Sequence, residues 1–302
     1  MKFILKIVVI IVILLILGFS SYEVFYKESE GAKSNDQKDN NDNETKDDNN
    51  DDNNENNNED GNDFVTEHTV FIEEGTATWC PNCPNAAEAL YALYNSSELP
   101  FYYVALVYDQ SSVAQYRMWY HYKGMAFPTI FLDGGFSDIV GSSSTPQQTE
   151  NLYRPAIEAA GARTVHPLAV TSNVTGHGNA KLDITVTVKN TGSKLYFGFV
   201  RSCVTEIESR WISQNGHPYH FGLLGYAVQK LVVLPPQKTK TFTATFDGAA
   251  KHGNLTFPDI VDNNIMVIST VCHLQPHVIA KEQYVGQHIA FYLDQAVGAT
   301  VQ

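Results

Sequence analysis

A Cys-x-x-Cys pair restricts the possible folds of this chain more than any other feature. Cys80 and Cys83 lie within Ile72–Leu90, IEEGTATWCPNCPNAAEAL, and directly follow Trp79. A strand-like run precedes the pair and a helix-like run follows it. The spacing alone fits a redox-active dithiol, half of a zinc site or a structural disulfide.

The residues around this pair predict alternating strands and helices. HTVFIEE and FYYVALVYD are typical of strands, whereas NAAEALYALYN places its apolar residues at helical spacing. PTIFLDGG and FSDIVG predict two strands around an Asp-Gly-Gly turn, and STPQQTENLYRPAIEAAG predicts a further helix. With a helix over SVAQYRMWYHYKG, the predicted order from Thr69 to Gly161 is β-α-β-α-β-β-α. We therefore expect an α/β domain over residues 64–163.

The pattern changes near His166. Seven strand-like runs follow, separated by turn residues. One of them, KLDITVTVKNTGS, alternates apolar and polar residues, as expected of a strand with one buried face. These runs predict an all-β, immunoglobulin-like sandwich over residues 164–302.

The N-terminus predicts export. Lys2 and Lys6 precede an unbroken apolar run from Ile7 to Leu17, which is the pattern of an export signal. No clear cleavage motif follows, so we expect residues 1–22 to be an uncleaved signal anchor and transmembrane helix, with a cleaved signal peptide as the alternative. In both cases the rest of the chain lies on the extracytoplasmic side, where disulfides persist.

Residues 23–63 predict a disordered acidic linker. The part over residues 33–63 contains twelve acids and three lysines, which accounts for nine of the thirteen net negative charges of the 302-residue chain. It has almost no apolar residue to bury, so it cannot offset the entropy of folding. The negative net charge also argues against a nucleic-acid partner, because phosphate binding requires clustered Lys and Arg.

The position of the cysteines before a helix favours redox chemistry. A helix that begins there directs unpaired N–H groups and a positive dipole end at Cys80, which lowers the pKa of its thiol. Cys83 lies one turn further on and can resolve a mixed disulfide. A zinc site would need two more ligands, for which His217 and His220 are the nearest candidates. A purely structural disulfide would close a very small loop and stabilise little.

At WCPNC and at FPT, residues 127–129, the chain resembles the thioredoxin superfamily. The resemblance implies that Pro128 is a cis-proline beside the redox pair. It also implies that Phe127, Trp79 and Pro81 contact substrates.

The same resemblance implies that Glu74, six residues before Cys80, is a buried proton acceptor. Glu73 is one residue out of that register and, on a strand, faces the other way. The longer string EEGTATWCPNCP is similar to bacterial envelope proteins that join such a domain to an immunoglobulin-like domain. Gly75 departs from both patterns, which have an aromatic residue there.

The other two cysteines, Cys203 and Cys272, lie in separate predicted strands. Each shares parity with apolar neighbours, so both are expected to point into the sandwich. We expect a structural disulfide between them, with two buried free thiols as the alternative.

Taken together, the sequence predicts a membrane-tethered, extracytoplasmic thiol–disulfide oxidoreductase. Its catalytic residues would be Cys80, Cys83, Glu74 and Pro128. Its partners would be exported protein thiols or disulfides, a redox protein in the membrane or outside the cytoplasm, and the membrane itself through the N-terminal helix. No cofactor and no metal is expected. The alternative is a non-catalytic surface adhesion or assembly protein with a structural disulfide.

Overall fold

A computed structural model of the chain describes residues 68–124 and 126–302. The predicted anchor (1–22) and acidic linker (23–63) lie outside these residues. Within the described part, no helix has the length and apolar character needed to cross a bilayer.

Strands and helices alternate in the first part of the described chain. They are β1 (Val70–Thr76), α2 (Cys83–Ser96), β2 (Phe101–Val107), α3 (Ser112–Tyr116), a π-helical segment (Arg117–Tyr122), β3 (Thr129–Leu132), β4 (Ser137–Val140) and α4 (Pro146–Gly161). The start of α4 follows from local chemistry, because the Thr145 hydroxyl accepts a hydrogen bond from the Gln148 backbone N–H at 3.2 Å. The element order predicted from the sequence is therefore found.

Long strands form the rest of the chain. They are β5 (Leu168–Gly176), β6 (Lys181–Asn190), β7 (Tyr196–Ile212), β8 (Pro218–Leu234), β9 (Thr239–Asp247), β10 (Ile265–Ile279) and β11 (His288–Thr300), with a short 3₁₀ turn at Asp262–Asn264. β7 and β8 have 17 residues each, so they are long enough to pair with each other and still reach the first part of the chain.

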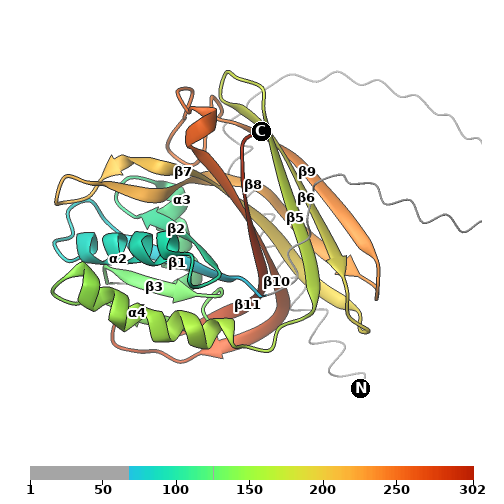
Figure 1. The fold of residues 1–302 in the computed structure, drawn as a ribbon, viewed down its shortest axis with the longest axis horizontal. Coiled ribbons are helices and arrows are strands. Elements are labelled where there is room, and N and C mark those ends of the chain that lie inside the picture. Colours follow the sequence, from blue (N-terminus) through green and yellow to red (C-terminus); the bar gives the residue numbers. More distant parts are fainter. Residues whose placement is uncertain (1–67, 125) are drawn as a thin grey trace, which may run out of the picture. The chain divides into compact units, whose positions relative to one another are not determined.

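All these strands belong to two sheets (Figure 1). The larger sheet has eight strands in the order β11-β10-β7-β8-β2-β1-β3-β4, and the smaller has three in the order β5-β6-β9. β1 pairs with β2 in parallel and with β3 antiparallel. The two parts of the chain meet at β2 and β8, where Ala105 and Gly222 form a parallel bridge.

The predicted fold class is therefore wrong. We expected a thioredoxin-like α/β domain followed by an independent immunoglobulin-like sandwich. Instead, strands predominate, the described residues contain only three α-helices, and one eight-stranded sheet passes through both expected domains. The sequence pattern could not show this, because the pairing of β2 with β8 joins residues more than a hundred positions apart.

Both faces of the large sheet are covered around β1. On one face, α2 and α4 contribute Leu90 and Ile157 to a core that includes Ile72 and Leu132 (Figure 1). On the other face, Met118 from the π-helical segment and Leu293 from β11 pack in the core that contains Phe71. A third core fills the space between the two sheets, with members such as Val186, Val200 and Phe246. β1 is thus a central strand, buried over its whole length.

Candidate dithiol–disulfide site

Cys80 and Cys83 form a disulfide at the start of α2. Their Cα atoms are 5.4 Å apart, and Cys83 is the first residue of the helix. Pro84 occupies the first turn and no acidic residue lies there, so no carboxylate neutralises the positive end of the helix dipole. A thiolate released at Cys80 on reduction would lie beside unpaired helix N–H groups, which favour the charged form.

The loop before the disulfide is held by an aspartate at the end of β2. The Thr78 backbone N–H donates to Asp109 Oδ1 at 2.9 Å, and the Thr78 hydroxyl donates to Oδ2 at 2.5 Å. The Cys80 N–H donates to the Ala77 carbonyl at 3.1 Å. These bonds fix the backbone on which Cys80 is presented.

Glu74 is a buried carboxyl group on the side of the sheet that α2 covers. It lies in β1 with the same parity as Ile72, whose side chain packs against α2. Neither carboxyl oxygen of Glu74 has a hydrogen-bond partner among the described residues. Burial raises the pKa of Glu74 to about 8, so this group is mostly protonated at neutral pH.

Glu73 faces the opposite side of β1 and is bound by an arginine. The Arg117 guanidinium donates to both carboxylate oxygens, at 2.7 and 2.6 Å, and the Tyr122 hydroxyl donates to Oε2. Burial acts to raise the pKa of Glu73, but the Arg117 charge and its hydrogen bonds outweigh burial and hold the pKa below the ordinary value. The predicted difference in orientation between the two glutamates is confirmed.

Phe127, which lies next to the disulfide and contacts Trp79, precedes a cis-proline. The Phe127–Pro128 peptide bond is cis, which confirms the conformation implied by the resemblance, and Pro128 is buried just before β3. Phe127 packs against the cluster formed by Ala77 and the two cysteines. Trp79 is 59% exposed and meets Phe127 edge to face, with ring centroids 5.8 Å apart.

Two exposed apolar residues flank Cys80. Trp79 and the neighbouring Pro81 are both exposed, whereas Cys80 retains only 2% of its surface and Cys83 none. A partner that reaches Cys80 would first contact Trp79 or Pro81. Of the site residues predicted from the sequence, Phe127 packs against the two cysteines and Trp79 contacts Phe127.

Tyr219 of β8 is a site residue that the sequence did not identify. Its hydroxyl donates to the Ala77 carbonyl at 3.0 Å and accepts a hydrogen bond from the Thr76 hydroxyl at 3.1 Å. Burial raises the pKa of Tyr219, with a further contribution from the Glu74 charge. Tyr219 thus binds the loop before the disulfide and also lies close enough to Glu74 to be affected by its charge. Only its position in an aromatic-rich segment could have drawn attention to it.

A groove of about 260 Å³ begins next to the disulfide, at the first turns of α2. One wall is α2 and the other is the β7–β8 hairpin, with the lining residues Pro84, Ala87, Glu88, Tyr91, Ser213, His217, Pro218 and His220. The His220 ring stacks on Tyr91 with centroids 3.4 Å apart. His217 and His220 therefore line this groove, where His217 contacts Glu88, and they do not complete a zinc site with the cysteines.

The expected disulfide between Cys203 and Cys272 is wrong, because both thiols are free. On the paired strands β7 and β10, Cys203 lies opposite Ile268 and Cys272 opposite Phe199. A four-residue offset along a strand corresponds to about 13 Å, whereas a disulfide requires Cα atoms within about 7 Å. Burial raises the pKa of Cys203 to about 12 and also raises that of Cys272, so neither thiol is a reactive nucleophile.

The described residues also contain a histidine–aspartate cluster that the sequence did not reveal. His166, His273 and Asp294 lie close together, although His166 is more than a hundred residues of chain from the other two. No spacing motif links them, since the connector after α4, β10 and β11 each supply one member.

No family model matches the chain, and no curated protein matches it. Among solved structures, the chain is similar to HBP35 of Porphyromonas gingivalis, with a TM-score of 0.55 and 14% identity over 78% of this chain and 76% of that one. A protein from Agrobacterium tumefaciens gives a TM-score of 0.47 and 12% identity over 79% of this chain and 97% of its own. The likeness to HBP35 concerns the fold alone.

Proposed function

We propose that this protein is a thiol–disulfide oxidoreductase that acts through Cys80 and Cys83. The observation that carries the proposal is a disulfide at the start of α2, on the sheet face that also holds the buried, unpartnered carboxyl group of Glu74. A structural disulfide needs no proton donor. A disulfide that opens and closes does, because each sulfur that leaves as a thiolate must be protonated or stabilised.

The reaction can be written from the oxidised state. A client thiolate attacks the Cys80 sulfur, the Cys80–Cys83 bond breaks, and Cys83 leaves as a thiolate that takes the proton of Glu74. A second client thiolate then attacks the client sulfur of the mixed disulfide and releases Cys80 as a thiolate at the helix N-terminus. The client loses two electrons and gains a disulfide, while the protein gains the dithiol. The reverse sequence reduces a client disulfide.

The surface around Cys80 supports protein clients. Trp79 and Pro81 offer an exposed apolar contact, and the groove along α2 starts one residue after Cys83. A peptide bound there would place its sulfur near the disulfide. We infer that the clients are exported proteins, because the N-terminal sequence predicts export and protein disulfides persist outside the cytoplasm.

Oxidative refolding of a reduced client protein, together with insulin reduction, tests this function. We expect Cys80→Ser to abolish both activities, and Cys83→Ser to accumulate a mixed disulfide between Cys80 and the client. Cys272→Ser is the matched control, since it removes a free thiol elsewhere in the chain and should leave both activities intact. Undiminished turnover in Cys80→Ser would refute the proposal.

The burial of the sulfur atoms favours a second candidate function. Cys80 and Cys83 expose 2% and 0% of their surfaces, as in a fixed disulfide of a non-catalytic adhesion or assembly protein. The reduction potential separates the two functions. A value below about −300 mV, with resistance to glutathione, would identify a structural bond, whereas a value near those of redox enzymes would support turnover.

A further inference from the structure

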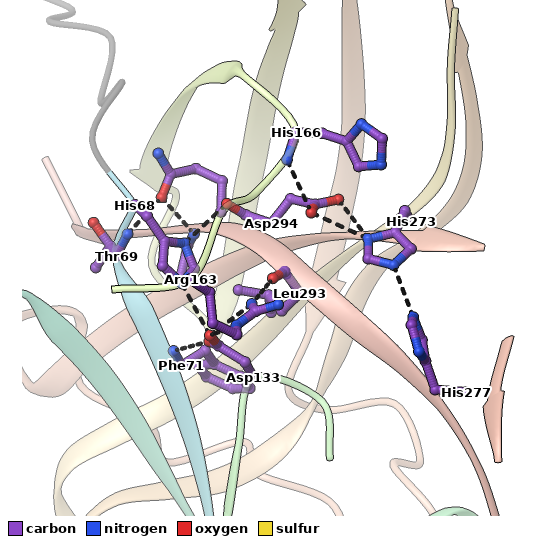
Figure 2. Close-up of polar contacts among 12 residues, drawn as sticks. His68, Thr69, Phe71, Asp133, Arg163, His166, His273, His277, Leu293 and Asp294 are labelled. Carbon is purple, nitrogen blue, oxygen red and sulfur yellow. Dashed lines mark hydrogen bonds and ion pairs between the residues drawn. The ribbon is translucent and has the colours of Figure 1, made fainter. Parts of the chain in front are cut away.

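Three potential metal ligands meet on one side of the molecule, away from the disulfide loop. His166 lies in the connector after α4, His273 on β10 and Asp294 on β11. One ligand atom from each lies within 4.8 Å of the other two. Figure 2 shows the three side chains directed toward one another.

Asp294 is fixed within this cluster. It is 1% exposed; its Oδ1 accepts the His166 backbone N–H at 3.3 Å, and its Oδ2 accepts the Tyr196 hydroxyl at 2.9 Å. These bonds hold the carboxylate in place. Its Oδ1 and Oδ2 atoms lie 3.1 and 3.0 Å from His273 Nδ1, which is hydrogen-bonding distance.

His273 is oriented from its other nitrogen as well. Its Nε2 lies 3.3 Å from the Nε2 of His277, and the His277 ring is stacked on Tyr292 with centroids 3.7 Å apart. A neutral imidazole carries one N–H. When that proton is on Nε2 and is donated to His277, the Nδ1 lone pair of His273 faces Asp294 and can bind a cation.

We propose that His166, His273 and Asp294 bind a divalent transition-metal ion, zinc being the best match. Two imidazoles and one carboxylate suit zinc and its neighbours, whereas calcium and magnesium prefer oxygen ligands alone. Zinc–ligand bonds of about 2.0–2.1 Å place tetrahedral ligands about 3.3 Å apart. The His166 side chain is exposed and can rotate inward to close the remaining distance.

Three protein ligands leave the coordination shell incomplete on the exposed side, where water or an external donor completes it. Asp294 would keep its bonds to Tyr196 and to the His166 N–H, and His277 would accept the N–H of His273. These outer contacts are of the kind that orient ligands in known metal sites.

A bound ion would also fasten the connector to the sheet. Arg163 already ties it there, because its guanidinium donates to Asp133 Oδ2 at 2.7 Å and to the Leu293 carbonyl. Three residues later the His166 backbone N–H already donates to Asp294 of β11, and coordination through the His166 side chain would strengthen this attachment. An ion that binds only the folded state raises the unfolding temperature by mass action, so stabilisation by zinc should depend on His166.

Calorimetric titration of the oxidised full chain with zinc chloride tests the proposal. The Cys80–Cys83 disulfide must be intact, so that no thiolate competes, and excess magnesium occupies sites made of carboxylates alone. We expect one equivalent of zinc to bind. His166→Ala should weaken binding by more than about tenfold and abolish the zinc-dependent rise in unfolding temperature, while leaving the unfolding temperature in chelator unchanged.

Two further variants complete the design. Asp294→Asn keeps the size of the side chain but removes its charge, and should also weaken binding. His177→Ala is the matched control, since His177 is a half-exposed histidine that lies 2.7 Å from the Asp183 carboxylate, and among the described residues this pair has no third potential metal ligand close by. Absence of binding in the wild type, or equal affinity in wild type and His166→Ala, overturns the proposal.

Discussion

At the scale of single residues, the two adjacent glutamates of β1 have opposite environments. Glu73 and Glu74 alternate across the strand, so one meets Arg117 and the other meets no polar partner among the described residues. The pKa of Glu73 is therefore lowered and that of Glu74 is raised. This alternation separates a structural carboxylate from a carboxylic acid that can deliver a proton.

Glu74 should make the protein less stable as the pH rises. Its folded-state pKa of about 8 exceeds the ordinary value of 4.5. The contribution of Glu74 to the free energy of unfolding is therefore fully present below pH 4.5 and is lost as the pH rises to 8. The decline is on the order of 5 kcal/mol. Chemical denaturation across this pH range should show a shallower decline in Glu74→Gln.

Glu158→Gln serves as the comparison, because Glu158 is exposed on α4 and its substitution should leave the pH profile of unfolding unchanged. Identical profiles for Glu74→Gln and the wild type would mean that Glu74 ionises freely in the folded protein. In that case its role as proton donor to Cys83 would also fail.

The alternation of Glu73 and Glu74 could be predicted from the sequence because it depends only on strand parity. The partners of these residues could not, since Arg117 lies 44 residues along the chain from Glu73. The same limit applies to Tyr219, which is 142 residues from the carbonyl it binds. A single sequence carries no signal for contacts of such separation.

At the scale of elements, β1 and the π-helical segment fit closely at Gly75. A Cβ atom at this position would lie 2.3 Å from Cε and 2.5 Å from Sδ of Met118, and Met118 is fully buried. The methionine thus fills the space that a side chain at this position would need. Glycine here is a packing requirement between two elements.

Gly75→Ala should therefore destabilise the protein by about 1–3 kcal/mol, the usual cost of overpacking a core. The cost should be smaller in a Met118→Ala background, which a double-mutant cycle by chemical denaturation would measure. Gly161→Ala is the control, because the nearest atom to its added Cβ is 3.7 Å away. A cost at Gly75 that does not depend on Met118 would contradict this explanation.

The order of the elements could be predicted because hydrophobic periodicity and helix caps are local. Thr145 with Pro146 marked the start of α4 correctly. Proline in a helix interior usually kinks or ends the helix, yet α4 contains Pro155 and runs without interruption from Pro146 to Gly161. The strand runs after residue 166 were also recognisable, but their division between two sheets depends on pairings that periodicity does not encode.

At the scale of the whole molecule, the chain is joined by one sheet and by a shared core. Cys203, Ile268 and Leu293 from the second part pack in the same core as Phe71 and Val104 from the first. A boundary at residue 163 would expose that core and the edge of β2 that faces β8. Compactness in the expected α/β segment therefore depends on the strands that follow.

A fragment of residues 64–163 should consequently fail to fold cooperatively, whereas the whole chain should unfold in a single transition. Near-ultraviolet circular dichroism and thermal melting of both would measure this. The fragment should lack the near-ultraviolet signal that packed aromatic residues give. An independent, sharp transition of the fragment would show that the shared core is not needed.

The two ends of the described chain are also tied to each other. The Thr69 N–H donates to the Gln295 side chain, and a His68 ring nitrogen lies 3.0 Å from the Asp294 carbonyl, each across 226 residues. During synthesis the residues just before β1 therefore remain without these partners until β11 has left the ribosome. A chain of this design can complete its fold only after β11 has been synthesised, and protease sensitivity of chains truncated before residue 294 would report that delay.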